Sequence, residues 1–219
     1  MWLFVLIGAC FLIFAIGRWW YGERQVTRRA LLAARRARIA EVGAGARVKL
    51  VGKLAYAGEP LCAPFSRRKC ALYWVAVEDR HASRSEQWAE ILQDRQMVSF
   101  WVEDESGRAL VEADVMPHVA MVVDAHFDSG LLDDPEPHIR AWATDRGIET
   151  QGMLFNKTLR YRESVLEAGD TVAVLGEAHW ERDPDPEAQH GYRERAKRLV
   201  VRAPADGRLM LSDDPSTLR

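Results

Sequence analysis

The sequence predicts a mainly β protein of the α+β class, with an N-terminal transmembrane helix and one compact antiparallel barrel-like or sandwich-like domain. Three observations support this class. Residues 1–17 are apolar throughout. Residues 22–42 are rich in arginine and in other residues that favour helix. From residue 43 onward, short segments with strand-like alternation are separated by turn residues.

Residues 1–21 are predicted to anchor the chain in a membrane. No charged residue precedes Arg18. At a rise of about 1.5 Å per residue, a helix that ends at Tyr21 spans roughly 31 Å, close to the bilayer's hydrocarbon thickness of about 30 Å. We expect Arg18 to snorkel and the aromatic side chains of Trp19, Trp20 and Tyr21 to lie among the headgroups.

An uncleaved anchor has two alternatives, a cleaved signal peptide and a lipoprotein leader. A cleaved signal peptide would have a basic leader and a small-residue cleavage site. Here nothing basic precedes the apolar run, and bulky aromatic residues follow it. The stretch from Ile7 to Cys10 is similar to a lipoprotein cleavage box, but Cys10 lies inside the apolar run. The flanking residues therefore favour an uncleaved anchor.

Residues 22–42 are predicted to form a basic juxtamembrane helix. No Gly or Pro interrupts residues 23–42, and each arginine near an anionic leaflet adds about 1 kcal/mol of attraction. We expect Arg24, Arg28 and Arg29 to contact anionic headgroups of the lipid bilayer. A solvated helical stalk is the alternative, because no wide apolar face accompanies the charges.

The charges of the chain indicate its orientation. Before Gly43, seven arginines face two glutamates, a net charge of +5; after it, 23 basic residues face 30 acidic ones, a net charge of −7. Because the arginines follow the anchor, the positive-inside rule places the N-terminus outside and the domain in the cytoplasm. The acidic domain disfavours nucleic-acid binding, which needs clustered cations.

Residues 43–212 are predicted to form the β-rich domain, with 213–219 as a C-terminal tail. Residues 83–96 are expected to form a loop or a short helix, 138–144 a short helix, and 158–166 either a helix or a strand. Residues 199–202 and 208–211 are expected to pair as a closing hairpin. The remaining strands are expected within 48–54, 70–77, 97–103, 108–115, 119–123 and 171–180.

The strand at 70–77 has two apolar faces. Alternation places Tyr73, Val75 and Val77 on one face and Leu72 and Trp74 on the other. Because neither face is polar, we expect this strand to be central. Its two faces would then be covered by the barrel interior and by the excursion at 83–96.

Short motifs in the domain resemble those of the GIDE domain, also called BAM ("beside a membrane"), in their residues and order. This family is found in bacterial membrane proteins and in a mitochondrial outer-membrane ubiquitin ligase. The matching residues are Gly45-x-x-Val48-Lys49-Leu50-x-Gly52, Ala63-Pro64-Phe65-Ser66, Cys70-x-x-Tyr73-x-Val75-x-Val77-Glu78, Phe100-x-Val102-Glu103-Asp104-x-x-Gly107-x-Ala109-x-Val111, Tyr161-x-Glu163-x-x-Leu166-x-x-Gly169-Asp170-x-Val172-x-Val174-Leu175-Gly176-Glu177 and Leu209-Met210-Leu211-Ser212.

The resemblance implies a domain beside a membrane, here a ring-less bacterial member in the inner (cell) membrane. Bacterial members often carry a second membrane helix after the domain, whereas this chain stops at Arg219. The eukaryotic ligase depends on a C-terminal zinc-binding ring module, which needs about eight Cys and His ligands. This chain has three cysteines and no CxxC pair. Ubiquitin-ligase activity is therefore not expected.

No catalytic, cofactor-binding or metal-binding residues are predicted. The six histidines lack metal-ligand spacing; the densest group is His118 and His126, near Asp124 and Asp128. The cations that follow Ser66, at residues 67–69, are expected to form a solvated turn, with anion or headgroup binding as the alternative.

Two functions follow from these observations. The first is a single-pass, membrane-tethered interaction or scaffold domain on the cytoplasmic face, with an unidentified protein partner and no cofactor. The alternative is a membrane-surface hydrolase or transferase that uses Glu163 with a nearby His118, His126 or His179 as acid and base. We expect Glu163 to be a structural carboxylate bonded to backbone N–H groups, because no partner acid or nucleophile is recognisable in the sequence.

Overall fold

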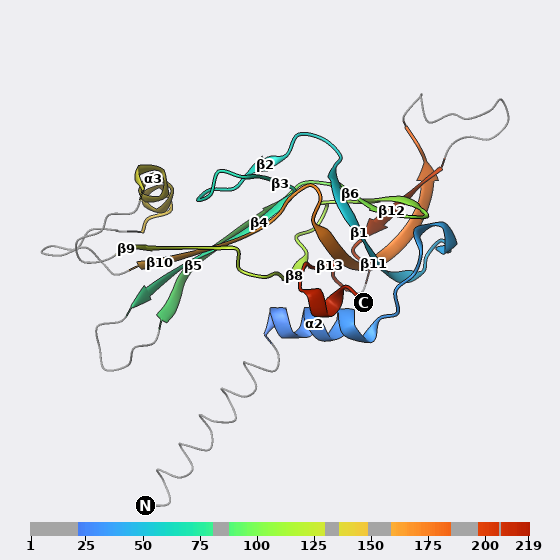
Figure 1. Cartoon of the computed structure of the whole chain (residues 1–219), viewed down its shortest axis with the longest axis horizontal. Helices are drawn as coiled ribbons and strands as arrows, with labels where there is room; N and C mark the ends of the chain where they lie inside the picture. Colours follow the sequence, from blue (N-terminus) through green and yellow to red (C-terminus); the bar gives the residue numbers. More distant parts are fainter. Residues whose placement is uncertain (1–21, 81–87, 130–135, 149–158, 185–196, 206) are drawn as a thin grey trace, which may run out of the picture. The chain divides into compact units, whose positions relative to one another are not determined.

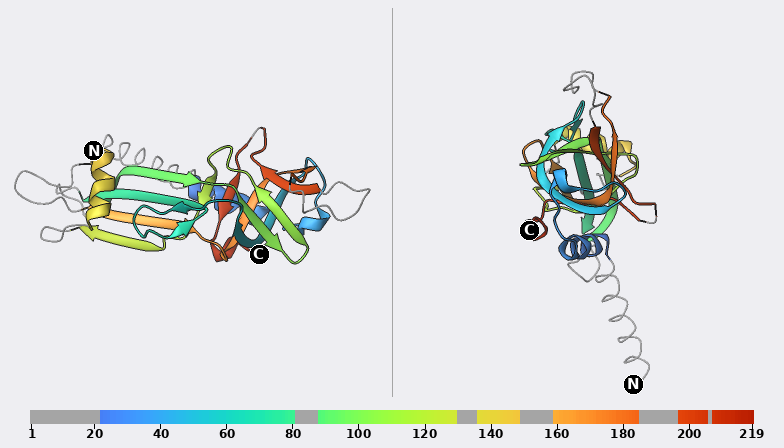
Figure 2. Two further views of the ribbon diagram at one scale, coloured as in Figure 1. Left: turned by 90° about the horizontal axis from the view of Figure 1, so that it is seen from above. Right: turned by 90° about the vertical axis from the view of Figure 1, so that its right-hand side faces the viewer.

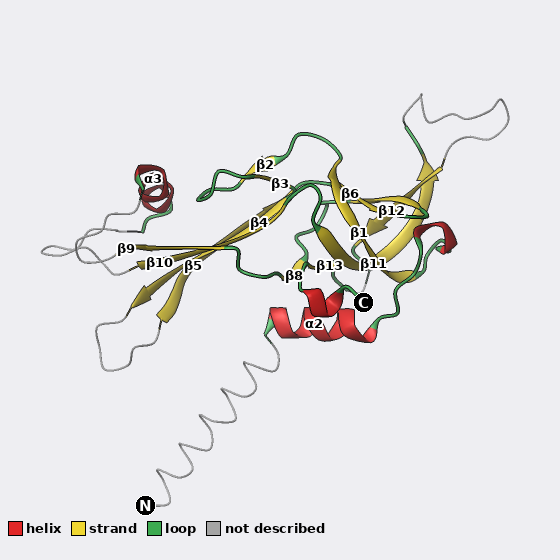
Figure 3. Cartoon of the chain, in the orientation of Figure 1, coloured by secondary structure: helices red, strands yellow, loops and turns green. Residues whose placement is uncertain are grey.

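The computed structural model describes the chain in separate stretches. These are residues 22–80, 88–129, 136–148, 159–184, 197–205 and 207–219. The predicted anchor at 1–21, with Arg18, Trp19, Trp20 and Tyr21, lies outside the described residues. Among the described helices, none is both long and apolar enough to span a bilayer. The described chain is mainly β, as the sequence predicts (Figure 3).

Five strands close into a barrel. They are β1 (Arg47–Tyr56), β6 (Phe100–Asp104), β7 (Gly107–Val111), β11 (Thr171–Arg182) and β12 (Lys197–Arg202). The order around the barrel is β1-β6-β7-β12-β11, and β11 pairs with β1 to complete the ring (Figure 1). The third and fifth of these strands in the chain, β7 and β12, run parallel. This order is that of an OB-fold, a Greek-key barrel of five strands.

Two further strands continue the sheet beyond β11. Strand β13 (Met210–Ser212) pairs with β11, and β8 (His118–Ala120) pairs with β13. The expected hairpin between 199–202 and 208–211 is therefore wrong, because β12 and β13 each pair with β11 and not with each other. The long strand β11 offers enough backbone to pair with both.

Two glycines of the predicted motifs lie where strands approach closely. A Cβ atom on Gly52 would lie 2.3 Å from the backbone oxygen of Glu103, and one on Gly176 would lie 2.6 Å from a methyl group of Val201. Only glycine, without a Cβ atom, fits such close backbone approaches. The close packing of the strands therefore explains why glycine stands at these two positions of the motifs.

Helix α2 (Glu23–Ala33) is shorter than the helix predicted for residues 22–42. It ends at Ala34, where the backbone is extended, and only the short 3₁₀ turn η1 (Ile39–Glu41) follows. Residues 34–42 favour helix by their composition, but the burial of Ile39 and Val42 in the barrel unit holds them in another conformation. In addition, the amide of Ala37 donates to the carbonyl of Lys49 on β1.

The C-terminal residues 213–219 pack against the barrel unit. The 3₁₀ turn η3 (Pro215–Thr217) contacts α2, and Thr217 is completely buried. Leu218 packs against a cluster of Leu31, Val51, Ala173 and Leu175. The predicted tail is thus a structural part of this unit.

The described residues form two compact units, although the sequence predicts a single domain over 43–212. The barrel unit contains the chain up to Lys53 together with Val102–Met121 and Thr171–Arg219. The sheet unit consists of Leu54–Trp101 and Val122–Asp170. In chain order, the first of these stretches lies between β1 and β6, and the second follows β8 and precedes β11.

The sheet unit contains a four-stranded antiparallel sheet in the order β5-β4-β10-β9. Its strands are β4 (Leu72–Arg80), β5 (Trp88–Met97), β9 (Ala125–Ser129) and β10 (Leu159–Leu166). Strand β4 is central, as predicted, and the ambiguous segment 158–166 forms a strand. The loop or helix expected at 83–96 is wrong for residues 88–96, which form the edge strand β5. Residues 81–87 lie outside the described residues.

One face of this sheet forms the core of the sheet unit. Helix α3 (Pro137–Asp145) and the hairpin of β2 (Leu61–Cys62) and β3 (Lys69–Cys70) lie on this face (Figure 1, Figure 2). The cluster there contains Tyr73, Val75 and Val77, which confirms their shared face. Trp74 lies on the other face and is half-buried. The predicted covering of that face is wrong for residues 88–96, because they belong to β5, which extends the sheet beside β4.

Candidate functional site

Helix α2 is the first described element after the predicted anchor, and one of its faces packs on the barrel unit. Thr27 and Leu31 are completely buried on that face. Leu32 is 51% exposed. The carboxylate of Glu23 accepts a hydrogen bond of 3.1 Å from the amide of Val119. These contacts fix α2 to the barrel, so its start is held against the folded unit.

The three predicted headgroup contacts on α2 have different environments. Arg24 is exposed, and Arg29 is half-buried. Arg28 donates through Nε to Ser216 Oγ at 3.1 Å, and the same atom lies 3.6 Å from the Asp214 carboxylate. Arg28 therefore joins α2 to η3, and the three arginines do not form one uniform outward stripe.

Asp214 is the acceptor at the centre of this joint. Its side chain accepts hydrogen bonds from the hydroxyl and the amide of Ser216, at 2.6 and 2.9 Å. These two bonds lower the pKa of Asp214, and the positive charge of Arg28 lowers it further. The carboxylate is thus held ionised where α2 meets the C-terminal turn.

Residues 34–42 cross from α2 to the barrel strands and are held by polar contacts. The guanidinium of Arg36 donates to the carbonyl of Val51 at 3.2 Å, and the indole of Trp180 donates to the carbonyl of Val42 at 2.8 Å. Asp104 accepts from the amide of Ile39 at 3.1 Å. Burial would raise the pKa of Asp104, but its hydrogen bonds, the strongest from Ser106, outweigh burial and lower it.

An open groove of about 860 Å³ lies beside these residues on the barrel unit. Its charged lining is mixed, with Arg36, Arg38 and Lys53 near the acidic stretch 103–105. One of these acids, Asp104, is already engaged in the contacts just described. The lining therefore selects no ligand of a single charge.

Glu163 holds a loop of the sheet unit in place. It is completely buried, and its two carboxylate oxygens accept hydrogen bonds of 2.9 Å from the amides of Phe65 and Ser66. The carbonyl of Phe65 contacts Nε2 of His138 at 2.8 Å. A carboxylate that accepts two backbone N–H bonds satisfies both amides inside the fold. The expectation of a structural carboxylate is confirmed.

The Phe65 ring lies in an aromatic cluster beneath this loop. Its centroid lies 5.0 Å from Trp142, 5.5 Å from Tyr161 and 6.1 Å from Phe127, each in an edge-to-face arrangement. Edge-to-face pairs add about 0.5–1.5 kcal/mol each beyond the burial of their area. The two motifs Ala63–Ser66 and Tyr161–Glu163 therefore contact each other in the fold. The Phe65 and Tyr161 rings pack together, and the Glu163 carboxylate accepts from the amides of Phe65 and Ser66, an arrangement that we call the Glu163 clasp.

The cations after Ser66 are partly neutralised. Arg68 pairs with Glu167 at 3.1 Å and with Asp124 at 3.3 Å, while Arg67 and Lys69 are exposed. The neighbouring Cys70 is buried. Burial raises the pKa of its thiol to about 12, and the nearby Glu163 carboxylate adds to this shift. Arg68 is therefore engaged by carboxylates, and the Cys70 thiol is held in its neutral form.

The histidines proposed as partners of Glu163 do not support an acid–base pair. His126 lies opposite Arg162 on β9, whereas Glu163 lies opposite Ala125, so His126 and Glu163 occupy different faces of the sheet. His118 and His179 belong to strands β8 and β11 of the barrel unit. In the part of the chain that the structure describes, no group of three or more His, Cys, Asp or Glu residues is arranged to hold a metal.

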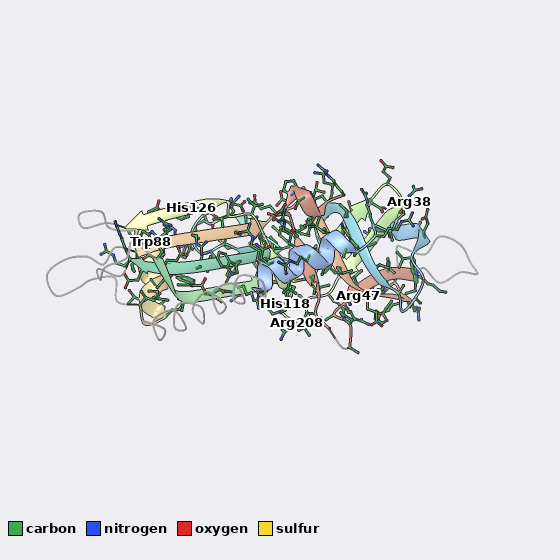
Figure 4. All side chains as sticks on the ribbon, turned by 90° about the horizontal axis from the view of Figure 1, so that it is seen from below. Arg38, Arg47, Trp88, His118, His126 and Arg208 are labelled. Carbon is green, nitrogen blue, oxygen red and sulfur yellow. The ribbon has the colours of Figure 1, made fainter. Side chains whose placement is uncertain are left out.

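Sequence reasoning missed the second face of the four-stranded sheet. Arg160 and Arg162 alternate with the buried Tyr161 on β10, so both arginines point to the face that α3 does not cover. Figure 4 looks onto this face and labels Trp88. The alternation of Arg160, Tyr161 and Arg162 indicates a strand with one polar face. The sequence does not decide between helix and strand at 158–166, so this face could not be predicted.

A family model described as GIDE, E3 Ubiquitin ligase, matches residues 75–203 of the chain. The matched stretch runs from β4 to the end of β12 and includes Glu163. The chain has no significant match among curated proteins or among solved structures.

Proposed function

Because the chain belongs to the GIDE family, we propose that it is a membrane-tethered interaction domain. In this proposal residues 1–21 cross the inner membrane of a bacterial cell once, with the N-terminus outside. The two described units then lie on the cytoplasmic side, where they bind a protein partner. The protein needs no cofactor for this role.

The observation that carries the proposal is the joint between the apolar segment and the folded barrel. The apolar run is followed at once by α2, and α2 is fixed to the barrel through Glu23, Leu31 and Arg28. A span that ends near Tyr21 therefore leaves the barrel next to the bilayer surface without a long linker. Such placement suits a domain that acts beside a membrane.

The environments of the arginines refine the proposed contact with lipids. Arg18 and the exposed Arg24 supply the attraction to anionic headgroups, at about 1 kcal/mol for each arginine near the surface. Arg28 instead serves the fold through Asp214 and Ser216.

No geometry in the described residues favours the alternative of a membrane-surface enzyme. Glu163, its proposed base, is buried and holds two backbone amides. The words E3 Ubiquitin ligase describe the family model, and this sequence has no CxxC pair for a zinc-binding ring. We therefore propose a binding role without catalysis.

Alkaline carbonate extraction of cell membranes tests the tether. The full chain is expected to stay in the pellet, as a spanning protein does, and a variant that lacks residues 1–21 is expected to become soluble. A variant with Arg24→Gln and Arg35→Gln is the matched control and should stay in the pellet. Release of the full chain by carbonate would contradict a spanning anchor.

A further inference from the structure

Helix α2 has an outer face that the barrel unit leaves open. Its inner face packs on β8, β11 and β13 (Figure 1), and Thr27 and Leu31 are completely buried there. Leu32 follows about 100° further around the helix, and it is 51% exposed. Ala33, the next residue, is also exposed. The packing on the barrel therefore fixes which side chains α2 turns outward.

The backbone at Gly22 separates α2 from the residues before it. Gly22 has φ −57° and ψ 138°, which is an extended conformation and not a helical one. A helix that ended at Tyr21 could therefore not continue straight into α2. A change of direction at Gly22 lets α2 run along a bilayer surface instead of standing out from it.

The charges of α2 suit an anionic surface. Its one acidic residue, Glu23, accepts a hydrogen bond from a backbone amide of β8 and is thus engaged by the barrel. Arg24 is exposed, as is Arg35 just beyond the end of the helix. The nearby Asp214 pairs with Arg28 at 3.6 Å, and Arg24 acts on it more weakly than Arg28 does. Arg24 and Arg35 are therefore placed to meet anions outside the fold.

We propose that α2 lies flat on an anionic bilayer, with Leu32 among the headgroups and with Arg24 and Arg35 beside lipid phosphates. This contact rests on the membrane tether proposed above, and it determines which side of the barrel unit faces the membrane. A helix in such a position buries its outer side chains about 5–10 Å into the boundary between headgroups and acyl chains. The barrel then stands on the bilayer through the side that carries α2.

The position of α2 in the chain favours lipid over protein as its contact. Only Gly22 separates α2 from the predicted anchor at residues 1–21. Leu32 lies roughly 15 Å from Gly22 along the helix, at about 1.5 Å per residue. An upright α2 would lift Leu32 away from the headgroups, whereas a flat α2 keeps it at their level. In addition, one apolar side chain flanked by arginines is much smaller than a standard protein interface of about 800 Å² per partner.

Fluorescence quenching in lipid nanodiscs tests this contact on the full chain. The environment-sensitive dye NBD is attached to L32C in a chain that also carries C10A and C62S, while Cys70 is buried. The nanodiscs contain phosphatidylcholine, phosphatidylglycerol and a lipid with a nitroxide quencher near its headgroup. We expect the dye at position 32 to show blue-shifted emission and strong quenching. The matched control K197C, at the exposed start of β12, should keep the emission of a dye in water.

The lipid charge and the two arginines provide the second part of the test. Quenching at position 32 should fall when phosphatidylglycerol is left out, and it should also fall in R24Q/R35Q when phosphatidylglycerol is present. Unchanged quenching in either case overturns the proposal, as does equal quenching at positions 32 and 197. If the labelled L32C chain fails to fold, A33C carries the dye and is judged by the same outcomes.

These results are distinguishable from a failure of the tether. Carbonate extraction reports on the anchor alone, and R24Q/R35Q is expected to stay in the pellet. A dye at position 32 that remains in water, on a chain that carbonate does not release, overturns the contact of α2 and leaves the tether intact. Release of the full chain by carbonate contradicts the tether and with it the contact that rests on it.

Discussion

At the scale of single residues, the Glu163 clasp links two segments that are 98 residues apart in the sequence. Buried hydrogen bonds to a charged group contribute about 1.5–3 kcal/mol each, and an unsatisfied buried amide costs about 1–3 kcal/mol. The clasp and the Phe65 ring contacts therefore contribute a large share of the stability of the sheet unit, which explains a carboxylate inside an aromatic core.

Glu163→Gln should lower the free energy of unfolding by about 3 kcal/mol. The amide keeps one acceptor oxygen but turns an NH₂ group toward a backbone N–H, so two donors face each other. Chemical denaturation of the full chain in detergent measures the loss. Glu59→Gln, at an exposed turn position of the same unit, is the matched control. Equal stability of the two variants would show that the clasp is not structural.

Gly52→Ala should lower the free energy of unfolding by at least about 2 kcal/mol, because overpacking forces the backbone to shift. The new methyl group would lie 2.3 Å from the Glu103 carbonyl oxygen on the adjacent strand. Gly58→Ala is the control, since no atom lies within 4 Å of the added group. A thermal melt in which both variants match the parent would contradict the close approach of β1 and β6.

At the scale of elements, three acidic residues tie neighbouring parts of the barrel unit together. Asp214 joins η3 to α2, Asp104 holds residues 34–42, and Glu112 bonds to Arg202 on β12. The pKa of each carboxyl is lowered in the folded protein. For Glu112 the main cause is its hydrogen bond with Arg202. The packing of these elements therefore depends on ionised carboxylates.

The barrel unit should lose stability in acid. A carboxyl group with a lowered folded pKa binds fewer protons when folded than when unfolded. Its contribution is fully present at pH 7 and is lost as the pH falls below about 5 and through the folded pKa. Asp214→Asn should reduce the difference in unfolding free energy between pH 7 and pH 3.5. Asp145→Asn, at an exposed position on α3, should leave this difference unchanged. If both variants show the same difference in unfolding free energy between the two pH values, Asp214 does not contribute to the acid sensitivity.

The elements also show what the sequence can and cannot predict. Strand periodicity correctly located β1, β4 and β11, because alternation and β-branched residues are local signals. The end of α2 was misjudged, because Ile39 is buried against distant residues that propensity does not register. The sequence does not predict strand β5, because its apolar and polar residues do not alternate regularly, and each of its residues is half-buried or exposed, as suits an edge strand. The partner atoms of Glu163 were unknown, although its structural role was expected.

At the scale of the whole molecule, the chain combines an apolar N-terminal segment, a five-stranded barrel and a four-stranded sheet unit. The separation into two units was not predictable, because the sheet unit is assembled from two insertions that share no local signal. In the function proposed above, α2 connects the anchor to the barrel, and the folded units bind a protein partner. This proposal requires the folded units to lie on the cytoplasmic side of the membrane.

A pair of C-terminal fusions tests this arrangement most directly. Green fluorescent protein folds and fluoresces in the cytoplasm, whereas alkaline phosphatase is active only in the periplasm. Each fusion to the full chain is measured in carbonate-washed membranes. The expected result is fluorescence that stays with the membranes and depends on residues 1–21, with negligible phosphatase activity. Phosphatase activity in the washed membranes, without fluorescence, would contradict the account.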